Sequence, residues 1–267
     1  MSEPVFNSHI WEEQAEPTNP FAAATCRCRG YDVYGELLGK ASYIDYIFLL
    51  FKGERPSKQA SAVLELLAVA LANPGPRDLS VHSAMAAGAT GNPASATLIA
   101  ALATGAGSYG GAREVLLAME NWRDCGTDLA KWKACLADEP KSPRPLIWPK
   151  MEHPAGFDPY GASCATPVLQ TLSKLCSVVP DGKLAWLAEN RTELEGDAGS
   201  PLAMSGVTAA AFCDIEFTPV EAEMLTLLLR LPGAAAHALE QRQRGFRQFP
   251  FFEVELTWLP ASPRLRS

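Results

Sequence analysis

The segment from Leu79 to Ala112 contains no Asp, Glu, Lys or Arg, and this constrains the fold more than any other feature. Its residues are mainly Ala, Gly, Ser and Thr, and Asn92-Pro93 interrupts it. A membrane-spanning helix instead needs about 20 predominantly apolar residues such as Leu, Ile and Phe. We therefore predict tightly packed, buried helices here, and no membrane span.

Helix signals dominate the rest of the chain. The apolar run Tyr43 to Lys52 ends at Gly53, and Ser57 is a candidate N-cap for a helix reaching about residue 72. Thr218 precedes Pro219 and stands three residues before Glu221, which is the pattern of a capping box. That helix is expected to run to Arg230 and to end at Pro232-Gly233. The sequence therefore predicts an all-α fold.

Two further helices are predicted to start at prolines that follow a capping residue, at Asn92-Pro93 and Ser200-Pro201. The helices over 93–104 and 201–213 are small or apolar on all sides, so we expect both at the centre of the molecule. Period-two patterns are rare, and short strands are expected only at 25–29 and 254–258.

Composition narrows the classes of function. Of the 267 residues, 48% are hydrophobic and 20% charged, as in a globular protein, and the net charge of -7 argues against nucleic acid as a partner. The seven cysteines are scattered without a zinc-type spacing, and the first residues are acidic without an apolar run. We expect a cytoplasmic protein with no metal site.

Prolines break the chain repeatedly between residues 137 and 167. Long irregular segments inside a compact domain are usually functional loops or linkers. The second half of this one, EHPAGFDPYGASC, combines glycines, aromatic rings and a carboxylate. We expect part of a functional site in this loop.

Three motifs, in order along the chain, resemble the citrate synthase / citryl-CoA lyase family. CRGYDVYGELLGKASYIDYIFLLFKGERPS resembles the opening R-G-Y-D element and the helix after it. SAMAAGATGNPASATLIAALATGAGSYGGAREVLLAM is similar to the helix pair leading to the family's L-H-G-G-A-N-E loop, and LRLPGAAAHALEQ to its S-R-x-x-G-W-x-A-H helix. The resemblance covers about residues 21 to 245 and implies the helical fold of that family.

The family's catalytic positions hold other residues here. Tyr109 stands at the histidine of L-H-G-G-A-N-E, and Gly156-Phe157-Asp158-Pro159-Tyr160 meets the G-F-G-H-R-V-Y element without its histidine or arginine. Ser205 replaces the aspartate of N-V-D, whereas Arg230 matches the arginine that holds a substrate carboxylate. The resemblance thus leaves three alternatives open: an enzyme of altered chemistry, a silent homologue that binds CoA or a carboxylate, or an all-α protein whose similarity to the family is limited to the fold.

On the enzyme reading, the catalytic candidates are Tyr109, Asp158 and Ser205. The Tyr109 phenol would donate a hydrogen bond to an enolate oxygen, and Asp158 would act as a base. The alternative is that Tyr109 fills the space of a lost histidine and Asp158 caps a turn. Gly110 and Gly111 form a tight turn whose backbone would admit a thioester.

The resemblance also implies an arrangement and partners. A large helical domain (1–112 and 201–267) would carry a smaller helical lobe (113–200) that closes over the cleft. The substrates would be an acyl-CoA such as acetyl-CoA and a 2-oxo acid such as oxaloacetate, with the CoA thioester as substrate and no bound cofactor. A homodimer or higher homo-oligomer is implied, in which Arg247 reaches the neighbouring subunit's site, or a pairing with an active sister subunit.

Other patterns have competing interpretations. The G-x-G-x-x-G match at 105–110 follows a predicted helix instead of a strand, so a helix-to-helix turn is preferred over dinucleotide binding. Cys164 with His153 as its base would make a nucleophile, but no cysteine-enzyme signature surrounds it, which favours an inert thiol. His153 itself is a candidate for substrate binding, although loop histidines are usually solvated. His82 and His237 lie in apolar helical segments and are expected to be structural.

Overall fold

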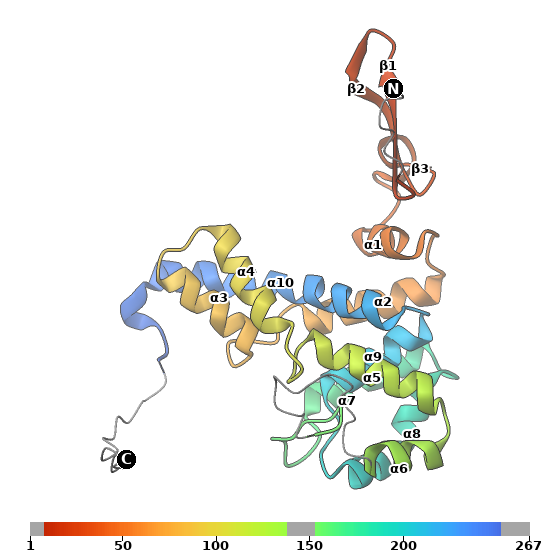
Figure 1. Ribbon diagram of the computed structural model, residues 1–267, viewed down its shortest axis with the longest axis vertical. Helices are drawn as coiled ribbons and strands as arrows, with labels where there is room; N and C mark the ends of the chain where they lie inside the picture. Colours follow the sequence, from red (N-terminus) through yellow and green to blue (C-terminus); the bar gives the residue numbers. More distant parts are fainter. Residues whose placement is uncertain (1–7, 138–152, 252–267) are drawn as a thin grey trace, which may run out of the picture.

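The computed structural model describes residues 8–137 and 153–251, which form a body of α-helices with a β-hairpin projecting from it (Figure 1). The predicted all-α class is confirmed, with the hairpin added at the N-terminal side. The strands are β1 (Trp11–Glu16), β2 (Asn19–Cys28) and β3 (Tyr31–Asp32), followed by the short π-helix η1 (Val33–Leu37). The helices are α1 (Tyr43–Lys52), α2 (Lys58–Leu71), α3 (Leu79–Ala89), α4 (Ala94–Gly105), α5 (Ala112–Cys125), α6 (Leu129–Ala137), α7 (Thr166–Val178), α8 (Lys183–Ala198), α9 (Met204–Asp214) and α10 (Pro219–Arg244), with the 3-10 turn η2 (Phe246–Gln248).

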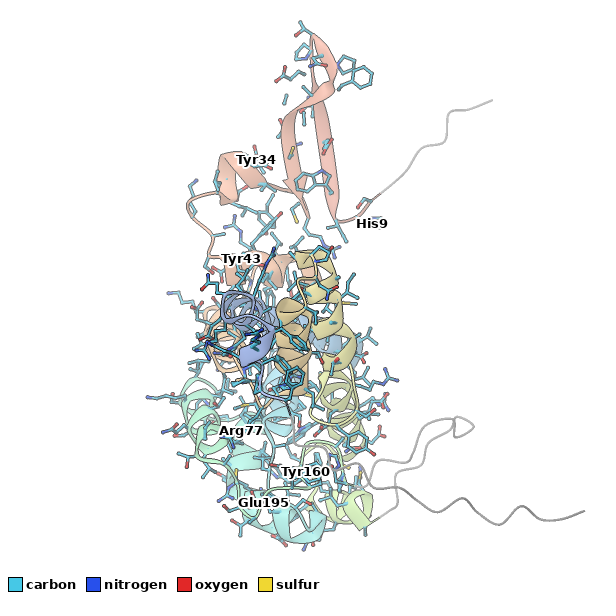
Figure 2. The ribbon with its side chains drawn as sticks, turned by 90° about the vertical axis from the view of Figure 1, so that its left-hand side faces the viewer. His9, Tyr34, Tyr43, Arg77, Tyr160 and Glu195 are labelled. Carbon is cyan, nitrogen blue, oxygen red and sulfur yellow. The ribbon has the colours of Figure 1, made fainter. Side chains whose placement is uncertain are left out.

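The hairpin contains one of the two predicted strands. β2 includes residues 25–28 and pairs antiparallel with β1 on one side and β3 on the other. Figure 2 shows the hairpin extending away from the helical body, with Tyr160 and Glu195 at the opposite end. The strand predicted at 254–258 lies outside the described residues.

The predicted caps of three helices are confirmed. Ser57 accepts a hydrogen bond from the Ala60 amide at the start of α2. Thr218 and Glu221 form the capping box of α10, and α1 ends at Gly53 in the left-handed conformation. These signals act within one turn, so tertiary packing has little influence on them.

The prediction that Pro232-Gly233 ends the last helix is wrong. α10 continues through both residues to Arg244. Pro232 cannot donate to the preceding turn, and the Gly233 amide donates instead to the Ala72 carbonyl at the end of α2, at 2.7 Å. A β-carbon at Gly233 would overlap that carbonyl oxygen, so the glycine permits the close approach of the two helices.

Two predicted helix starts are also displaced. The cap of α4 is Pro93, while the Asn92 side chain turns back and donates to the Ala87 carbonyl. Ser200-Pro201 does not start a helix, because α9 begins at Met204. Leu202 instead forms an isolated antiparallel bridge with Phe157, which connects the proline-rich loop to the start of α9.

The core is divided between two buried clusters. The larger cluster joins α1, α2, α5 to α9 and the first half of α10. The smaller one joins α3, α4 and the second half of α10. α9 is buried along most of its length, as predicted, but the central position predicted for α4 is wrong, since Ile99 is 63% exposed. Within the described residues, no helix is long and apolar enough to cross a bilayer.

Candidate functional site

Glu114 is a buried carboxylate on which three segments converge. It lies in the first turn of α5 with only 1% of its surface exposed. Its Oε2 accepts a hydrogen bond from the Gly110 amide at 2.5 Å. Its Oε1 accepts from the Gly156 amide at 3.1 Å and from Ser205 Oγ at 2.7 Å. A buried carboxylate is stable only when such donors replace water, so these bonds hold the three segments in place.

Glycines allow the three segments to come this close. A β-carbon at Gly111 would overlap the carbonyl oxygens of Gly105 and Gly107, so the turn between α4 and α5 needs glycine there. A β-carbon at Gly206 would likewise overlap the Gly156 carbonyl oxygen. Gly156 itself has φ +96°, a left-handed conformation that favours glycine. The helix-to-helix turn predicted from 105–110 is thereby confirmed.

His153 is buried at the same place, contrary to the expectation of a solvated loop histidine. Only 4% of the residue is exposed, and Nε2 lies 3.8 Å from Glu114 Oε1. Its ring centroid is 5.6 Å from that of Tyr109. Neither ring nitrogen has a hydrogen-bond partner among the described residues. Buried polar atoms are rarely left unpaired in native proteins, and those that are often have a functional reason.

Arg230 connects α10 to the glycine turn. Its guanidinium donates to the Gly110 carbonyl at 2.8 Å and pairs with Asp78, the N-cap of α3. The side chain is 11% exposed. Since a guanidinium carries five N–H donors, several remain for a further partner after these two contacts.

The predicted residues fall into two groups. Tyr109, Gly110, Gly111, His153, Ser205 and Arg230 are joined by the contacts around Glu114. Tyr109 is 41% exposed and Gly110 is exposed as well, so the turn before α5 is open to solvent. Asp158 lies two residues beyond Gly156, where its side chain accepts from the Tyr160 amide at 2.9 Å, and no hydrogen bond among the described residues joins it to Glu114. Arg247 lies in η2 at the end of α10, where it is exposed.

Glu114 and Asp78 were not among the sequence candidates. The sequence places Glu114 only as an acidic residue near the start of a predicted helix, where the helix dipole favours a negative charge. One signal was available, because Glu114 is the first carboxylate after the charge-free segment and follows the Gly110-Gly111 pair.

The thiol of Cys164 shows no sign of activation. Burial, and then the charge of Glu195, raises its pKa, and Sγ donates to the Leu202 carbonyl. This supports the inert thiol over the nucleophile, because the thiolate is the reactive form. Within residues 8–137 and 153–251, no group of three or more His, Cys, Asp or Glu is placed to hold a metal ion.

The arrangement offers complementary groups for acid–base chemistry on an anionic substrate. A buried imidazole beside a carboxylate can move a proton, and a partly exposed phenol can donate a hydrogen bond. A guanidinium with free N–H groups can bind a carboxylate.

The fold of this chain is similar to those of several solved structures. The chain matches citryl-CoA lyase from Hydrogenobacter thermophilus with a TM-score of 0.71 and 18% identity, over 98% of this chain and 97% of that one. ATP citrate lyase from Methanothrix soehngenii, solved with citrate and coenzyme A, matches with a TM-score of 0.72 and 16% identity, over 98% of this chain but 43% of that chain.

A more distant match is citrate synthase from Thermoplasma acidophilum, solved with carboxymethyl coenzyme A and oxaloacetate. It has a TM-score of 0.53 and 17% identity over 83% of this chain and 60% of that one. No family model matches the sequence, and no curated protein does so. The structural matches agree with the sequence motifs, and they show that this chain has the helical fold shared by citryl-CoA lyases and citrate synthases.

Proposed function

We propose that this chain forms or cleaves a carbon–carbon bond between an acyl-CoA, with acetyl-CoA as the simplest donor, and a 2-oxo acid of the oxaloacetate kind. The observation that supports this most is the buried Glu114 carboxylate, which gathers Gly110, Gly156 and Ser205 beside His153. The fold supports the same chemistry, since citryl-CoA lyase and citrate synthase share it.

The reaction needs a base, a donor for the enolate and an anchor for the acid. The base removes a proton from the carbon beside the thioester carbonyl, the resulting enolate carbon bonds to the ketone carbon, and the alkoxide takes up a proton. Cleavage reverses these steps. His153 is suited to the proton transfers because its ring nitrogens lack partners among the described residues, and Asp158 is the alternative base.

The groups around the Glu114 carboxylate would fill the remaining roles in the reaction. The Tyr109 hydroxyl would donate to the enolate oxygen, and the Gly110-Gly111 backbone would lie along the thioester. Ser205, with its hydroxyl on Glu114, would keep that carboxylate beside His153. Arg230 would bind a carboxylate of the acid with its remaining N–H groups.

We also propose a closing lobe and a homodimer. Residues 113–200 would form the smaller lobe that closes over the substrates. Two copies of the chain would pair, and the exposed Arg247 of one would reach the site of the other. An assembly of this kind would work in the cytoplasm, where CoA thioesters are supplied.

Paired assays in the two directions test the activity. Cleavage is followed as oxaloacetate release from citryl-CoA, coupled to malate dehydrogenase, and condensation as the loss of oxaloacetate in the presence of acetyl-CoA. Tyr109→Phe should lower kcat by about a hundredfold, the usual effect of removing one enolate donor. Tyr160→Phe, an exposed tyrosine in the same loop as Asp158, is the control and should leave the rate unchanged. Equal rates for Tyr109→Phe and wild type would remove Tyr109 from the mechanism.

Asp158→Asn separates the two candidate bases. Asparagine keeps an oxygen that accepts from the Tyr160 amide, so the turn should survive. If Asp158 only caps the turn, the rate should stay within about twofold of wild type. A loss of about a hundredfold or more would make Asp158 the base in place of His153.

The second candidate function is a silent homologue that binds CoA or a carboxylate, alone or beside an active sister subunit. The observation that favours it is Ser205, which stands where the family's base aspartate is expected and bonds to Glu114. Saturable CoA binding by calorimetry without turnover in either direction would support it. Turnover by the purified chain alone would exclude it.

A further inference from the structure

The carboxylate of Asp78 contacts two different groups with its two oxygens. Its Oδ1 caps α3, accepting from the Ser80 amide at 2.9 Å and from Ser80 Oγ at 2.5 Å. Its Oδ2 accepts from Nη2 of Arg230 on α10, the helix that lies beside α3 (Figure 1). One side chain therefore both starts a helix and holds the arginine of the Glu114 site.

The backbone around Asp78 is itself held in place. Its amide donates to the Gly75 carbonyl at 3.0 Å, and its carbonyl accepts from the His82 amide at 2.8 Å. Ser80 is 5% exposed and packs against Gly105, where an added β-carbon would lie 3.2 Å from the Ser80 Cβ. The start of α3 is thus fixed against the end of α4, next to the glycine turn.

Two contacts at different nitrogens fix the plane of the Arg230 guanidinium. Nη1 donates to the Gly110 carbonyl at 2.8 Å, and Nη2 donates to Asp78. Among the residues that the structure describes, Asp78 is the one carboxylate within ion-pair distance of Arg230. Without it the guanidinium would rotate about its bond to Gly110, and a bound substrate would have to remove that freedom.

We propose that Asp78 is a positioning residue, which holds Arg230 in the orientation that binds the carboxylate of the 2-oxo acid. The N–H groups that neither contact uses are presented to the substrate in a fixed plane. This role rests on the proposed function. Asp78 also offsets part of the arginine charge, and the proposal is that its effect on orientation is the larger of the two.

Asp78→Ser isolates the contact with Arg230. Serine is also a preferred capping residue, so α3 keeps its start, but it has no second oxygen for the guanidinium. The KM for the 2-oxo acid should rise by about tenfold, while kcat and the KM for acetyl-CoA change by less than about threefold. A KM for the 2-oxo acid that is unchanged or lower than that of wild type would overturn the proposal, since Asp78 would then be idle or compete with the substrate.

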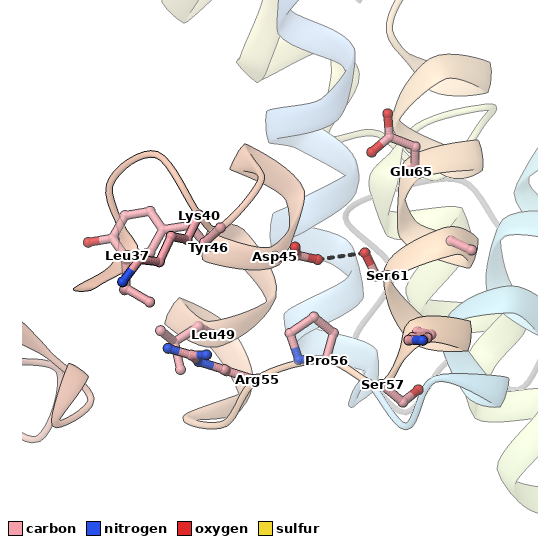
Figure 3. A pocket seen from close by; sticks show the side chains of 13 residues that line it. Leu37, Lys40, Asp45, Tyr46, Leu49, Arg55, Pro56, Ser57, Ser61 and Glu65 are labelled. Carbon is pink, nitrogen blue, oxygen red and sulfur yellow. Dashed lines mark hydrogen bonds between the residues drawn. The ribbon is translucent and has the colours of Figure 1, made fainter. Parts of the chain in front are cut away.

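Two matched controls use the same substitution elsewhere. Asp128 is exposed and accepts from the Ala130 and Lys131 amides at the start of α6, so Asp128→Ser tests the exchange of one cap for another. Asp45 bonds to Ser61 on the neighbouring helix α2 (Figure 3), on elements that contribute no residue to the Glu114 site. Asp45→Ser thus tests a general loss of helix packing, and neither control should change either KM.

A double variant shows whether Asp78 acts through Arg230. If it does, the KM of Asp78→Ser/Arg230→Lys for the 2-oxo acid should equal that of Arg230→Lys within about twofold, because the contact is already lost. Effects of the two substitutions that multiply would overturn the proposal, since they would mean that the two residues act independently.

Modification of Arg230 by phenylglyoxal, followed by mass spectrometry, gives a readout that needs no turnover. The reaction should be about tenfold faster in Asp78→Ser, as expected for the loss of one charge-assisted hydrogen bond, and unchanged in Asp128→Ser. Faster modification in a chain whose wild type shows no turnover would support the hold of Asp78 on Arg230 and contradict the proposed function alone. An unchanged rate of modification in Asp78→Ser would overturn the proposal whatever the activity.

Discussion

The Ser205 hydroxyl donates to the Glu114 carboxylate at 2.7 Å, across 91 positions of the sequence. The same carboxylate oxygen accepts from the Gly156 amide. One buried group thereby holds the start of α9, the second half of the proline-rich loop and the turn before α5 in fixed positions. The segments it joins also position His153 and Tyr109.

Removal of this carboxylate should destabilise the protein. Glu114→Ala leaves the Gly110 and Gly156 amides without their acceptor in a buried place, and should lower the free energy of unfolding by about 3 kcal/mol. Urea denaturation measures it. Glu189→Ala, an exposed glutamate on α8, is the control and should change stability by less than about 0.5 kcal/mol. Equal effects of the two variants would contradict the structural role of Glu114.

The contact between Gly156 and Gly206 predicts opposite effects for two glycine substitutions. Gly206→Ala places a β-carbon against the Gly156 carbonyl oxygen and should destabilise by about 2 kcal/mol. Gly196→Ala, within α8, meets no atom within 4 Å and should stabilise by about 0.5 to 1 kcal/mol, since alanine is the better helix former. Thermal unfolding should move the midpoint in opposite directions. A higher midpoint for Gly206→Ala would show that the two segments are not closely packed.

Ser61→Ala should produce a pH-dependent loss of stability. The Ser61 hydroxyl, more than the Ser42 contacts, lowers the pKa of Asp45, so the bond stabilises the folded protein when Asp45 is ionised. The variant should lose about 1 kcal/mol at neutral pH. The difference should shrink as pH falls through the acid range in which Asp45 gains a proton. Urea denaturation at neutral and acidic pH measures it, and a pH-independent difference would contradict the assignment.

Arg230→Lys tests the anchor for the acid substrate. Lysine keeps the charge but loses the planar arrangement of donors that contacts Gly110 and Asp78 and that would also hold the substrate carboxylate. The KM for the 2-oxo acid should rise by about tenfold, with a smaller change in the KM for acetyl-CoA. Steady-state kinetics with each substrate varied in turn measures it. An equal rise for both substrates would indicate a distorted site instead of a lost anchor.

Local signals explain what could be predicted from the sequence. The Ser57 cap and the Thr218–Glu221 box depend on residues within one turn, and both are present. The end predicted at Pro232 failed because the Ala72 carbonyl, distant in sequence, accepts the Gly233 amide. The apolar character of α4 predicted burial, yet it covers only one side of the smaller cluster and leaves Ile99 exposed.

The site was predictable only in part, for the same reason. The resemblance identified Tyr109, Ser205 and Arg230. Contacts around the Glu114 carboxylate connect these three residues. The burial of His153 and the role of Glu114 depend on segments that meet only in the folded chain. No periodicity or motif predicts that the segments of Glu114 and His153 come into contact, because each segment alone has an ordinary composition.

We propose that His153, beside Glu114, moves the proton in carbon–carbon bond chemistry on a CoA thioester. The most direct measurement is the initial rate of oxaloacetate release from citryl-CoA by wild type and by His153→Gln, compared at equal thermal stability. We predict measurable cleavage by wild type and a rate lower by about a hundredfold or more in His153→Gln. An unchanged rate in His153→Gln, or no cleavage by wild type in the presence of bound citryl-CoA, would contradict the claim.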